Sequence, residues 1–290
     1  MSNLETQRTF ALVGTGGCGK TSLAEMLLFD ARAISRMGAI EDGGTSLDYE
    51  PEEIRRRGSI QPACATYLWN GNRHFLLDIP GDGNFTGDMD YLLTGVDGVL
   101  FVIDAVDGVR PLTRKFWQSV RDARLPAIIA INKMDRDRAD FQMAFDSLSS
   151  LGIRPVALQL PIRRGEDFAG YVDVLEGRAL FFGPDGGLTE GEIPAELADD
   201  AALLRDVAVE NIAESDETLM EQYLEEGSLD PEALAAGLRA GVLSGGLAPV
   251  LVCAALRDRG GRVLLDAVQR LLPSPLERPA FVDAAGAEHT

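Results

Sequence analysis

One short segment near the N-terminus limits what this chain can fold into. The apolar run FALV at residues 10–13 is followed by GTGGCGKT at residues 14–21 and by the helical stretch SLAEMLL at residues 22–28. Between a strand and a helix, the spacing G-x-x-x-x-G-K-T is typical of a phosphate-binding loop, because glycines let successive backbone N–H groups face an anion. The pattern predicts that a polyphosphate is bound by Gly14, Thr15, Gly16, Gly17, Cys18, Gly19, Lys20, Thr21 and Ser22.

Two side chains of this loop carry the predicted chemistry. We expect Lys20 to bridge the β- and γ-phosphates and Thr21 to give its hydroxyl to Mg²⁺. Cys18 in the same loop is either a small filler or a thiol whose pKa is lowered by nearby backbone N–H groups and by Lys20. The alternative for the whole segment is a glycine-rich turn that binds nothing, which leaves the flanking strand and helix unexplained.

Charge is unevenly distributed along the 290 residues, whose net charge is −19. Residues 185–240 hold 16 Asp and Glu against two arginines, Arg205 and Arg239. Such a surface repels nucleic-acid phosphates, so we expect no direct sequence-specific contact with nucleic acid. The acidic segment is either a solvated helical surface or a docking face for a partner protein.

Signals for export or membrane insertion are not evident in the sequence. The N-terminus lacks the pattern of a signal peptide, and no apolar run approaches the ~18 residues of a membrane helix. Cys18, Cys64 and Cys253 lie far apart, with the spacing of neither a disulfide framework nor a zinc site. We therefore expect a cytoplasmic protein with reduced thiols and no membrane contact.

Apolar runs alternate with helical patterns along most of the chain, which is typical of an open α/β sheet. A phosphate-loop domain, with a mostly parallel sheet and helices on both faces, is expected at residues 1–160 and 247–275. An acidic α+β subdomain is expected as an insertion at residues 161–246, with a helix starting at Asp230 and Pro231. Residues 35–62 have no clean periodicity and are interpreted as a mobile loop. Expected strands are 10–13, 66–69, 74–78, 98–105, 127–132, 155–160, 249–254 and a possible β segment at 170–182; expected helices are 22–31, 112–123, 139–151 and 261–272.

A second motif, DIPG at residues 78–81, follows the strand at 74–77. At a strand end, the Asp78 carboxylate can hold Mg²⁺ through a water molecule, and the N–H of Gly81 can approach a γ-phosphate. Alone, this motif is more typical of an ordinary turn at the end of a strand.

A third motif, NKMD at residues 132–135, ends the strand at 127–132 and predicts which base is bound. Guanine presents N1–H and an exocyclic amine side by side, so the Asp135 carboxylate can accept two hydrogen bonds, whereas adenine would leave that charge unmatched. Asn132 is expected to tie this loop to the phosphate loop, and Lys133 to lay its stem along the base. The tetrapeptide alone is also consistent with a helix cap.

With these motifs in order, the chain resembles the translational GTPases, and most of all the GTPase domain of elongation factor G and its paralogues. The resemblance covers nearly the whole chain, through GTGGCGKTSLAE, EDGGTSLDYEPEEIRRRGSI, DIPGDGNF, NKMD, PVLVCAAL and LLPSPLERP. It implies GTP/GDP and Mg²⁺ as ligands and the ribosome as partner. It also places Ala255 where a backbone N–H reads the guanine carbonyl, and Leu256 over the ring.

Three departures from the family pattern bear on catalysis. Ser59 stands where a threonine hydroxyl would sense the γ-phosphate and Mg²⁺, and Ala254 replaces the serine of the last guanine motif. Asp82 stands where the elongation factors usually carry the histidine that orients the attacking water, so we count Asp82, Lys20 and Gly81 as the candidate catalytic residues. The nearby Arg55, Arg56 and Arg57 either screen this carboxylate or form a solvated run of charge.

Two functional hypotheses therefore remain open. One is a GTPase that couples GTP binding and hydrolysis to a ribosomal step such as translocation or recycling. The other is a degenerate GTP-dependent switch or binding module that hydrolyses slowly, while a nucleotide kinase is disfavoured by NKMD. The resemblance also implies the ribosomal stalk or another protein as partner of the acidic insertion, and a linker at residues 276–290 leading to a further domain.

Overall fold

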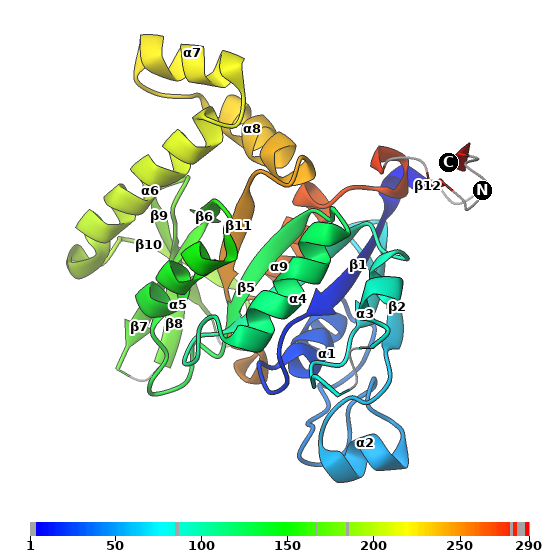
Figure 1. Cartoon of the computed structure of the whole chain (residues 1–290). Helices are drawn as coiled ribbons and strands as arrows, with labels where there is room; N and C mark the ends of the chain where they lie inside the picture. Colours follow the sequence, from blue (N-terminus) through cyan, green and yellow to red (C-terminus); the bar gives the residue numbers. More distant parts are fainter. Residues whose placement is uncertain are drawn as a thin grey trace.

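A seven-stranded sheet forms the centre of the computed structural model, which describes residues 4–84, 87–165, 167–183 and 186–278 and the backbone of 281–282 and 288–289 (Figure 1). Its strand order is β2-β3-β1-β4-β5-β11-β6, and every neighbouring pair is parallel except the β2–β3 hairpin. The strands are β1 Gln7–Val13, β2 Ala63–Trp69, β3 Asn72–Asp78, β4 Gly98–Asp104, β5 Ala127–Asn132, β6 Pro155–Ala157 and β11 Ala248–Val252.

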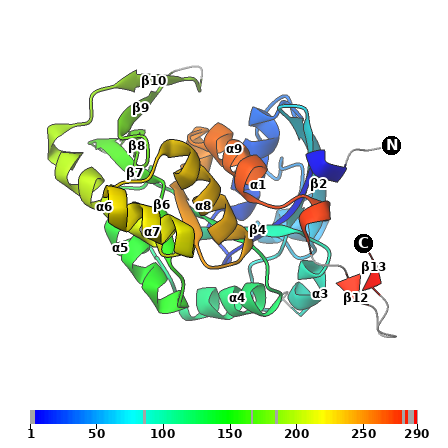
Figure 2. The ribbon, with the colours of Figure 1, turned by 90° about the horizontal axis from the view of Figure 1, so that it is seen from above.

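Helices cover both faces of this sheet, as Figure 2 shows from above: α1 and α9 lie on one face, and α3, α4 and α5 on the other. Because both faces are covered, every residue of β4, β5 and β11 is buried, which explains their continuous apolar sequences. The helices are α1 Lys20–Asp30, α3 Met89–Leu93, α4 Pro111–Asp122, α5 Phe141–Ser147 and α9 Gly261–Leu271. The expected mostly parallel α/β architecture is thereby confirmed.

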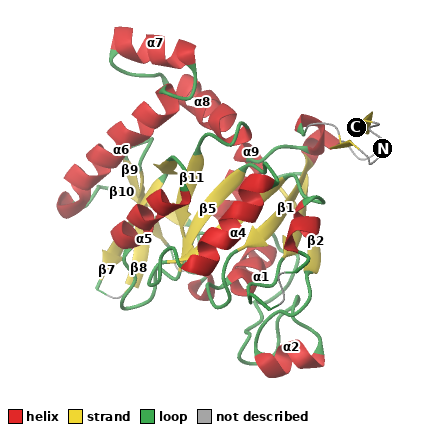
Figure 3. Cartoon of the chain, in the orientation of Figure 1, coloured by secondary structure: helices red, strands yellow, loops and turns green. Residues whose placement is uncertain are grey.

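A second, four-stranded antiparallel sheet lies beside the first, in the order β10-β9-β8-β7 (Figure 3). Three helices follow it, and α8 begins as expected: Pro231 is at its first turn and the Asp230 side chain accepts a hydrogen bond from the Ala233 N–H at 2.8 Å. These elements are β7 Gln159–Arg164, β8 Asp167–Asp173, β9 Arg178–Phe182, β10 Leu188–Gly191, α6 Ala198–Ala213, α7 Glu217–Glu226 and α8 Pro231–Leu243.

The expectation of one strand at residues 155–160 was wrong, because this segment belongs to both sheets. Leu158 is the crossing point: its N–H donates to the Val250 carbonyl of the parallel sheet, and its carbonyl accepts from the Val174 N–H near the second sheet. β6 therefore ends at Ala157 and β7 begins at Gln159. Periodicity cannot reveal such a crossing, since both halves are equally apolar.

Other differences are smaller. The segment 35–62 contains a short helix, α2 Pro51–Arg56, with proline at its first turn. The β segment expected at 170–182 is two strands, β8 and β9, and β10 is an additional strand. Residues 184 and 185, between β9 and β10, lie outside the described part of the chain. Among the residues that the structure describes, no helix has both the length and the apolar character needed to cross a membrane.

Candidate nucleotide-binding site

The phosphate loop connects β1 to α1 at the carboxyl edge of the parallel sheet. Gly19 adopts φ +93°, and a Cβ there would lie 2.4 Å from Asn132 Nδ2, so only glycine fits between this loop and the end of β5. The Gly16 N–H donates to the Gly81 carbonyl at 2.7 Å, which joins the loop to the segment after β3. The buried Lys20 ammonium lies 3.4 Å from the Thr15 carbonyl, folded back under the loop.

Three oxygen-bearing side chains from separate segments meet beside the phosphate loop. Thr21 Oγ1 donates to Asp78 Oδ2 at 2.8 Å and lies 3.1 Å from Ser59 Oγ. Burial raises the pKa of the Asp78 carboxyl to about 6, against the opposing effects of Lys20 and Thr21. Its Oδ1 is buried without a hydrogen-bond partner among the described residues, so an acceptor is available where a cation would be favourable.

Hydroxyl and carboxylate oxygens are ligands that suit Mg²⁺, directly or through water. Thr21, Ser59 and Asp78 therefore fit the metal-binding role that the sequence predicts for them. The structure has brought together three residues that the chain separates by up to 57 positions.

The candidate catalytic segment lies at the edge of the phosphate loop. A Cβ on Gly81 would lie 2.3 Å from Lys20 Nζ and 2.6 Å from Gly14 O, so a side chain at this position would displace the loop. Asp82 is exposed, and its Oδ1 accepts hydrogen bonds from the Asn84 N–H at 2.9 Å and from Asn84 Nδ2 at 3.0 Å. These bonds hold the Asp82 carboxylate in a local turn.

Two of the three arginines that could either screen Asp82 or form a solvated run of charge pair with another residue. Arg55 and Arg56 both pair with Glu52 on the exposed surface of α2. Of the two interpretations of this run, the structure favours exposed, solvated charge for these two side chains.

The NKMD segment is tied to the phosphate loop by two side chains. Asn132 Nδ2 donates to the Cys18 carbonyl at 3.0 Å, as the sequence predicts. Lys133, at φ +69°, donates from Nζ to the Gly17 carbonyl and lies 2.6 Å from Asp104 Oδ2. The Asp135 side chain is mostly buried and lies 3.5 Å from the Arg257 guanidinium.

The last predicted segment follows β11 and packs on the same loops. The Ala255 N–H donates to Asn132 Oδ1 at 3.0 Å, so its predicted contact with a guanine carbonyl would have to share or replace this bond. Ala254 is buried, and its N–H donates to the Arg259 carbonyl at 3.0 Å. Leu256 is 48% exposed, so its apolar side chain is accessible to a base.

Cys18 corrects one expectation. The thiol was expected to have a lowered pKa, but burial raises the pKa of Cys18, and this outweighs the opposing effects of Lys20 and Lys133. Its side chain is only 2% exposed and faces Gly14, where an added Cβ would lie 2.9 Å from the sulfur. The role of a small filler is therefore favoured over that of a reactive thiol.

Several carboxylates near the site were not found by sequence reasoning. Glu25 is fully buried on α1 and accepts a hydrogen bond from the Gly38 N–H at 2.8 Å, which anchors the start of the 38–62 loop. Glu53 accepts from the Ile60 N–H at 2.9 Å and anchors its end. Asp48 is buried between these anchors, and burial raises the pKa of its carboxyl despite a hydrogen bond from Ser59.

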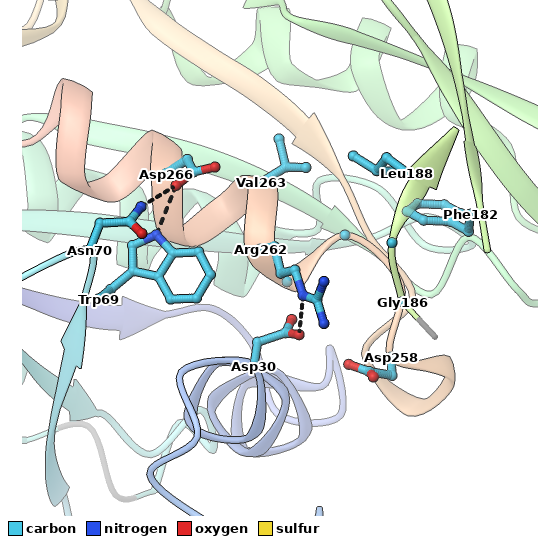
Figure 4. A pocket seen from close by; sticks show the side chains of 13 residues that line it. Asp30, Trp69, Asn70, Phe182, Gly186, Leu188, Asp258, Arg262, Val263 and Asp266 are labelled. Atoms are coloured by element: carbon cyan, nitrogen blue, oxygen red, sulfur yellow. Dashed lines mark hydrogen bonds and ion pairs between the residues drawn. The ribbon is translucent and has the colours of Figure 1, made fainter. Parts of the chain in front are cut away.

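A cavity of about 360 Å³ lies away from the phosphate loop, between α1, the tip of the β2–β3 hairpin, α9 and the second sheet (Figure 4). Trp69 Nε1 donates to Asp266 Oδ1 at 2.8 Å, and Arg262 lies 3.2 Å from Asp30 Oδ1. Burial raises the pKa of Asp30 to about 6, with a further contribution from Asp258. These contacts hold the hairpin and α1 to α9.

This chain is similar to known proteins along nearly its whole length. The family model described as the elongation factor Tu GTP binding domain matches residues 5–274. The elongation factors G of Thermotoga petrophila and Thermotoga neapolitana are 34% and 35% identical to it over 280 residues, which are 96% of this chain and 40% of each relative. The crystal structure of ttk003000868 from Thermus thermophilus superposes with a TM-score of 0.88 and 34% identity, covering 95% of this chain and 43% of that one.

The chain thus spans about 40% of the length of the curated relatives that it matches. The family match, residues 5–274, includes the phosphate loop and the residues that the sequence predicts to bind the metal and guanine. This chain belongs to the elongation factor Tu GTP-binding domain family, as an elongation factor G-like translational GTPase domain.

Proposed function

We propose that this domain binds GTP with Mg²⁺ at the phosphate loop, hydrolyses it to GDP and phosphate, and couples that cycle to a ribosomal step such as translocation or recycling. The observation that carries the proposal is the meeting of Thr21 with Asp78 at 2.8 Å and with Ser59 at 3.1 Å, beside Lys20. A strand-to-helix turn without a ligand has no need for a buried, unpartnered carboxylate oxygen at this point.

In the reaction, a water oxygen attacks the γ-phosphorus, and the bond from that phosphorus to the β–γ bridging oxygen breaks. Lys20 and the loop N–H groups stabilise the negative charge on the β- and γ-oxygens, and Gly81 lets backbone reach the γ-phosphate. When bound, Mg²⁺ neutralises further charge on these oxygens, and Thr21, Ser59 and Asp78 are the residues that would hold it.

Guanine is selected by the NKMD segment and by the segment after β11, which Asn132 joins through its bond with Ala255. The Asp135 carboxylate accepts from the guanine edge, and Leu256 covers the ring. Arg257 pairs with Asp135 in this structure, so hydrogen bonds from guanine to Asp135 would replace that ion pair when the nucleotide binds.

A second candidate is a slowly hydrolysing switch with the same ligands. The observation that favours it is Asp82, a carboxylate in the place of the family's histidine and bonded to Asn84. A carboxylate in that place would bring negative charge near the γ-phosphate and repel it.

Two measurements separate these possibilities. Titration calorimetry with GDP and ATP, in Mg²⁺, tests the site: GDP should bind in the micromolar range or tighter and ATP at least ~100-fold more weakly, the cost of an unmatched buried carboxylate. Equal affinities would refute guanine selection. Single-turnover GTP hydrolysis with and without ribosomes then distinguishes a stimulated GTPase from a switch whose rate ribosomes leave unchanged.

We further propose that residues 161–246 form a separate insertion and that its acidic helices dock a partner protein, such as one of the ribosomal stalk. On α6, Leu203 is 63% exposed and Val207, one turn later, is also exposed, beside acidic neighbours. Apolar anchors within a charged rim are typical of protein-binding surfaces. Leu203→Ser should weaken ribosome binding without changing GDP affinity, because α6 lies outside the nucleotide loops.

A further inference from the structure

Asp104, at the carboxyl end of β4, is a charged residue of the site that no motif covers. Its Oδ2 lies 2.6 Å from Lys133 Nζ, and its Oδ1 accepts a hydrogen bond from the Val106 N–H at 2.8 Å. The two side chains of the ion pair are mostly buried, 10% exposed for Asp104 and 23% for Lys133. Both carboxylate oxygens therefore have defined partners.

The strand register explains this geometry. β4 and β5 are parallel neighbours, and Asp104 is the register partner of Asn132, the residue before Lys133. The Ala105 N–H also donates to the Asn132 carbonyl at 2.9 Å, so the pairing continues past the strand end. The ion pair joins the ends of two neighbouring strands, which position the two side chains more precisely than two loops would.

Lys133 needs such an anchor. Its stem is long and flexible, and its ammonium reaches across to the Gly17 carbonyl of the phosphate loop. A free lysine side chain loses much rotamer freedom when it is held in one place, and a single contact to a carbonyl offsets that cost poorly. With Asp104 on one side and Gly17 on the other, one ammonium joins β4, the guanine loop and the phosphate loop.

We propose that Asp104 is a positioning residue for guanine-nucleotide binding, acting through Lys133 to pre-organise the guanine loop against the phosphate loop. The inference rests on the proposed function, because it concerns how tightly that site binds its nucleotide. Asp104 touches no nucleotide in this scheme; it reduces the ordering that binding would otherwise require.

A double-mutant cycle tests the connection between the two residues. Asp104→Asn keeps an acceptor for the Val106 N–H but removes the charge, and Lys133→Met removes the ammonium. By calorimetry with GDP and Mg²⁺, we expect Asp104→Asn to weaken binding ~10-fold or more, the range of a lost charge-assisted hydrogen bond. In the Lys133→Met background, Asp104→Asn should change the affinity less than ~2-fold, because its partner is already absent.

Asp107→Asn is the matched control, since Asp107 lies in the same loop but pairs with Arg110 on the surface. It should leave GDP affinity unchanged. Equal losses from Asp104→Asn in both backgrounds would overturn the proposal and make Asp104 a residue that acts independently of Lys133. If the wild type binds GDP and Asp104→Asn binds it with the same affinity, this inference alone is refuted. If the wild type does not bind GDP, the proposed function is refuted.

A second measurement does not require Asp104→Asn to fold. Lys20, Lys115 and Lys133 are the only lysines of the sequence, so NMR of ¹⁵N-lysine-labelled protein gives three ammonium signals, with Lys133 assigned by its Met variant. In the wild type, the Lys133 signal should exchange with solvent more slowly than that of Lys115. Asp104→Glu, which keeps the charge, should retain part of this protection. Equal, fast exchange of Lys133 and Lys115 in the wild type would contradict the anchored ammonium.

Discussion

His74 makes the stability of this domain depend on pH in a way that can be calculated. Its imidazole is fully buried on β3, 5.0 Å from the Tyr67 ring, and neither ring nitrogen has a hydrogen-bond partner among the described residues. Burial, with a smaller contribution from the Arg8 guanidinium, lowers the pKa of His74 from 6.5 to about 4. The folded protein therefore holds a neutral imidazole at pH values where the unfolded chain is protonated.

The sign of the effect follows from proton binding. Between pH 6.5 and 4 the unfolded state binds more protons at this site, so the free energy of unfolding falls as the pH falls. A pKa difference of about 2.5 corresponds to a maximum loss of ~3.4 kcal/mol below pH 4, and to about 2 kcal/mol at pH 5. Asp30 and Asp78, each with a pKa raised to about 6, act in the opposite direction over the same range.

A comparison of variants isolates His74 from these carboxylates. Urea unfolding of the wild type and of His74→Phe should be measured from pH 4.5 to 7.5, and the difference between the two free energies plotted against pH. Because the carboxylates contribute equally to both proteins, the difference should change by about 2 kcal/mol between pH 7 and 5 in favour of the variant. His289→Gln, at the other histidine of the sequence, controls for the loss of one histidine.

Parallel stability curves for the wild type and His74→Phe would refute this reasoning. They would show that the imidazole finds a proton acceptor or water when charged, so that its burial costs nothing. NMR titration of the His74 ring checks the same point directly, since an apparent pKa near 6.5 in the folded protein would contradict the calculated loss.

Three further predictions concern the nucleotide site. Asp135→Asn should lower GDP affinity ~10-fold or more and raise affinity for xanthosine diphosphate, measured by calorimetry, because the amide can donate to the 2-oxo group of xanthine. If charge is the obstacle, Asp82→Asn and Asp82→His should both raise the rate of single-turnover GTP hydrolysis, by up to ~100-fold for the removal of about 3 kcal/mol of repulsion. No rise in either variant would show that the charge of Asp82 is screened. Cys18 should react with iodoacetamide more slowly than the exposed Cys64, with or without GDP, since its thiol is buried with a raised pKa; rapid alkylation of Cys18 in folded protein would contradict this burial.

Local sequence determined the parts of this protein whose structure depends on near neighbours. Glycines, capping residues and apolar residues a few positions apart control such features, so the sequence predicts them. They are the phosphate loop, the hairpin across Asn70 and Gly71, the end of β5 at Asn132 and the start of α8 at Asp230. The bond from Asn132 to the phosphate loop was also predicted, on the strength of motif order.

Tertiary structure decided what depends on residues far apart in sequence. The crossing of Leu158 between two sheets, the burial that raises the pKa of Cys18, and the pairing of Asp104 with Lys133 each arise from segments that meet only after folding. Asp104 ends an apolar strand just as Asp78 does, so its sequence signal existed, but nothing local shows which cation lies opposite. Desolvation and charge pairing are set by three-dimensional surroundings, and for that reason the chemistry of these side chains follows from the fold.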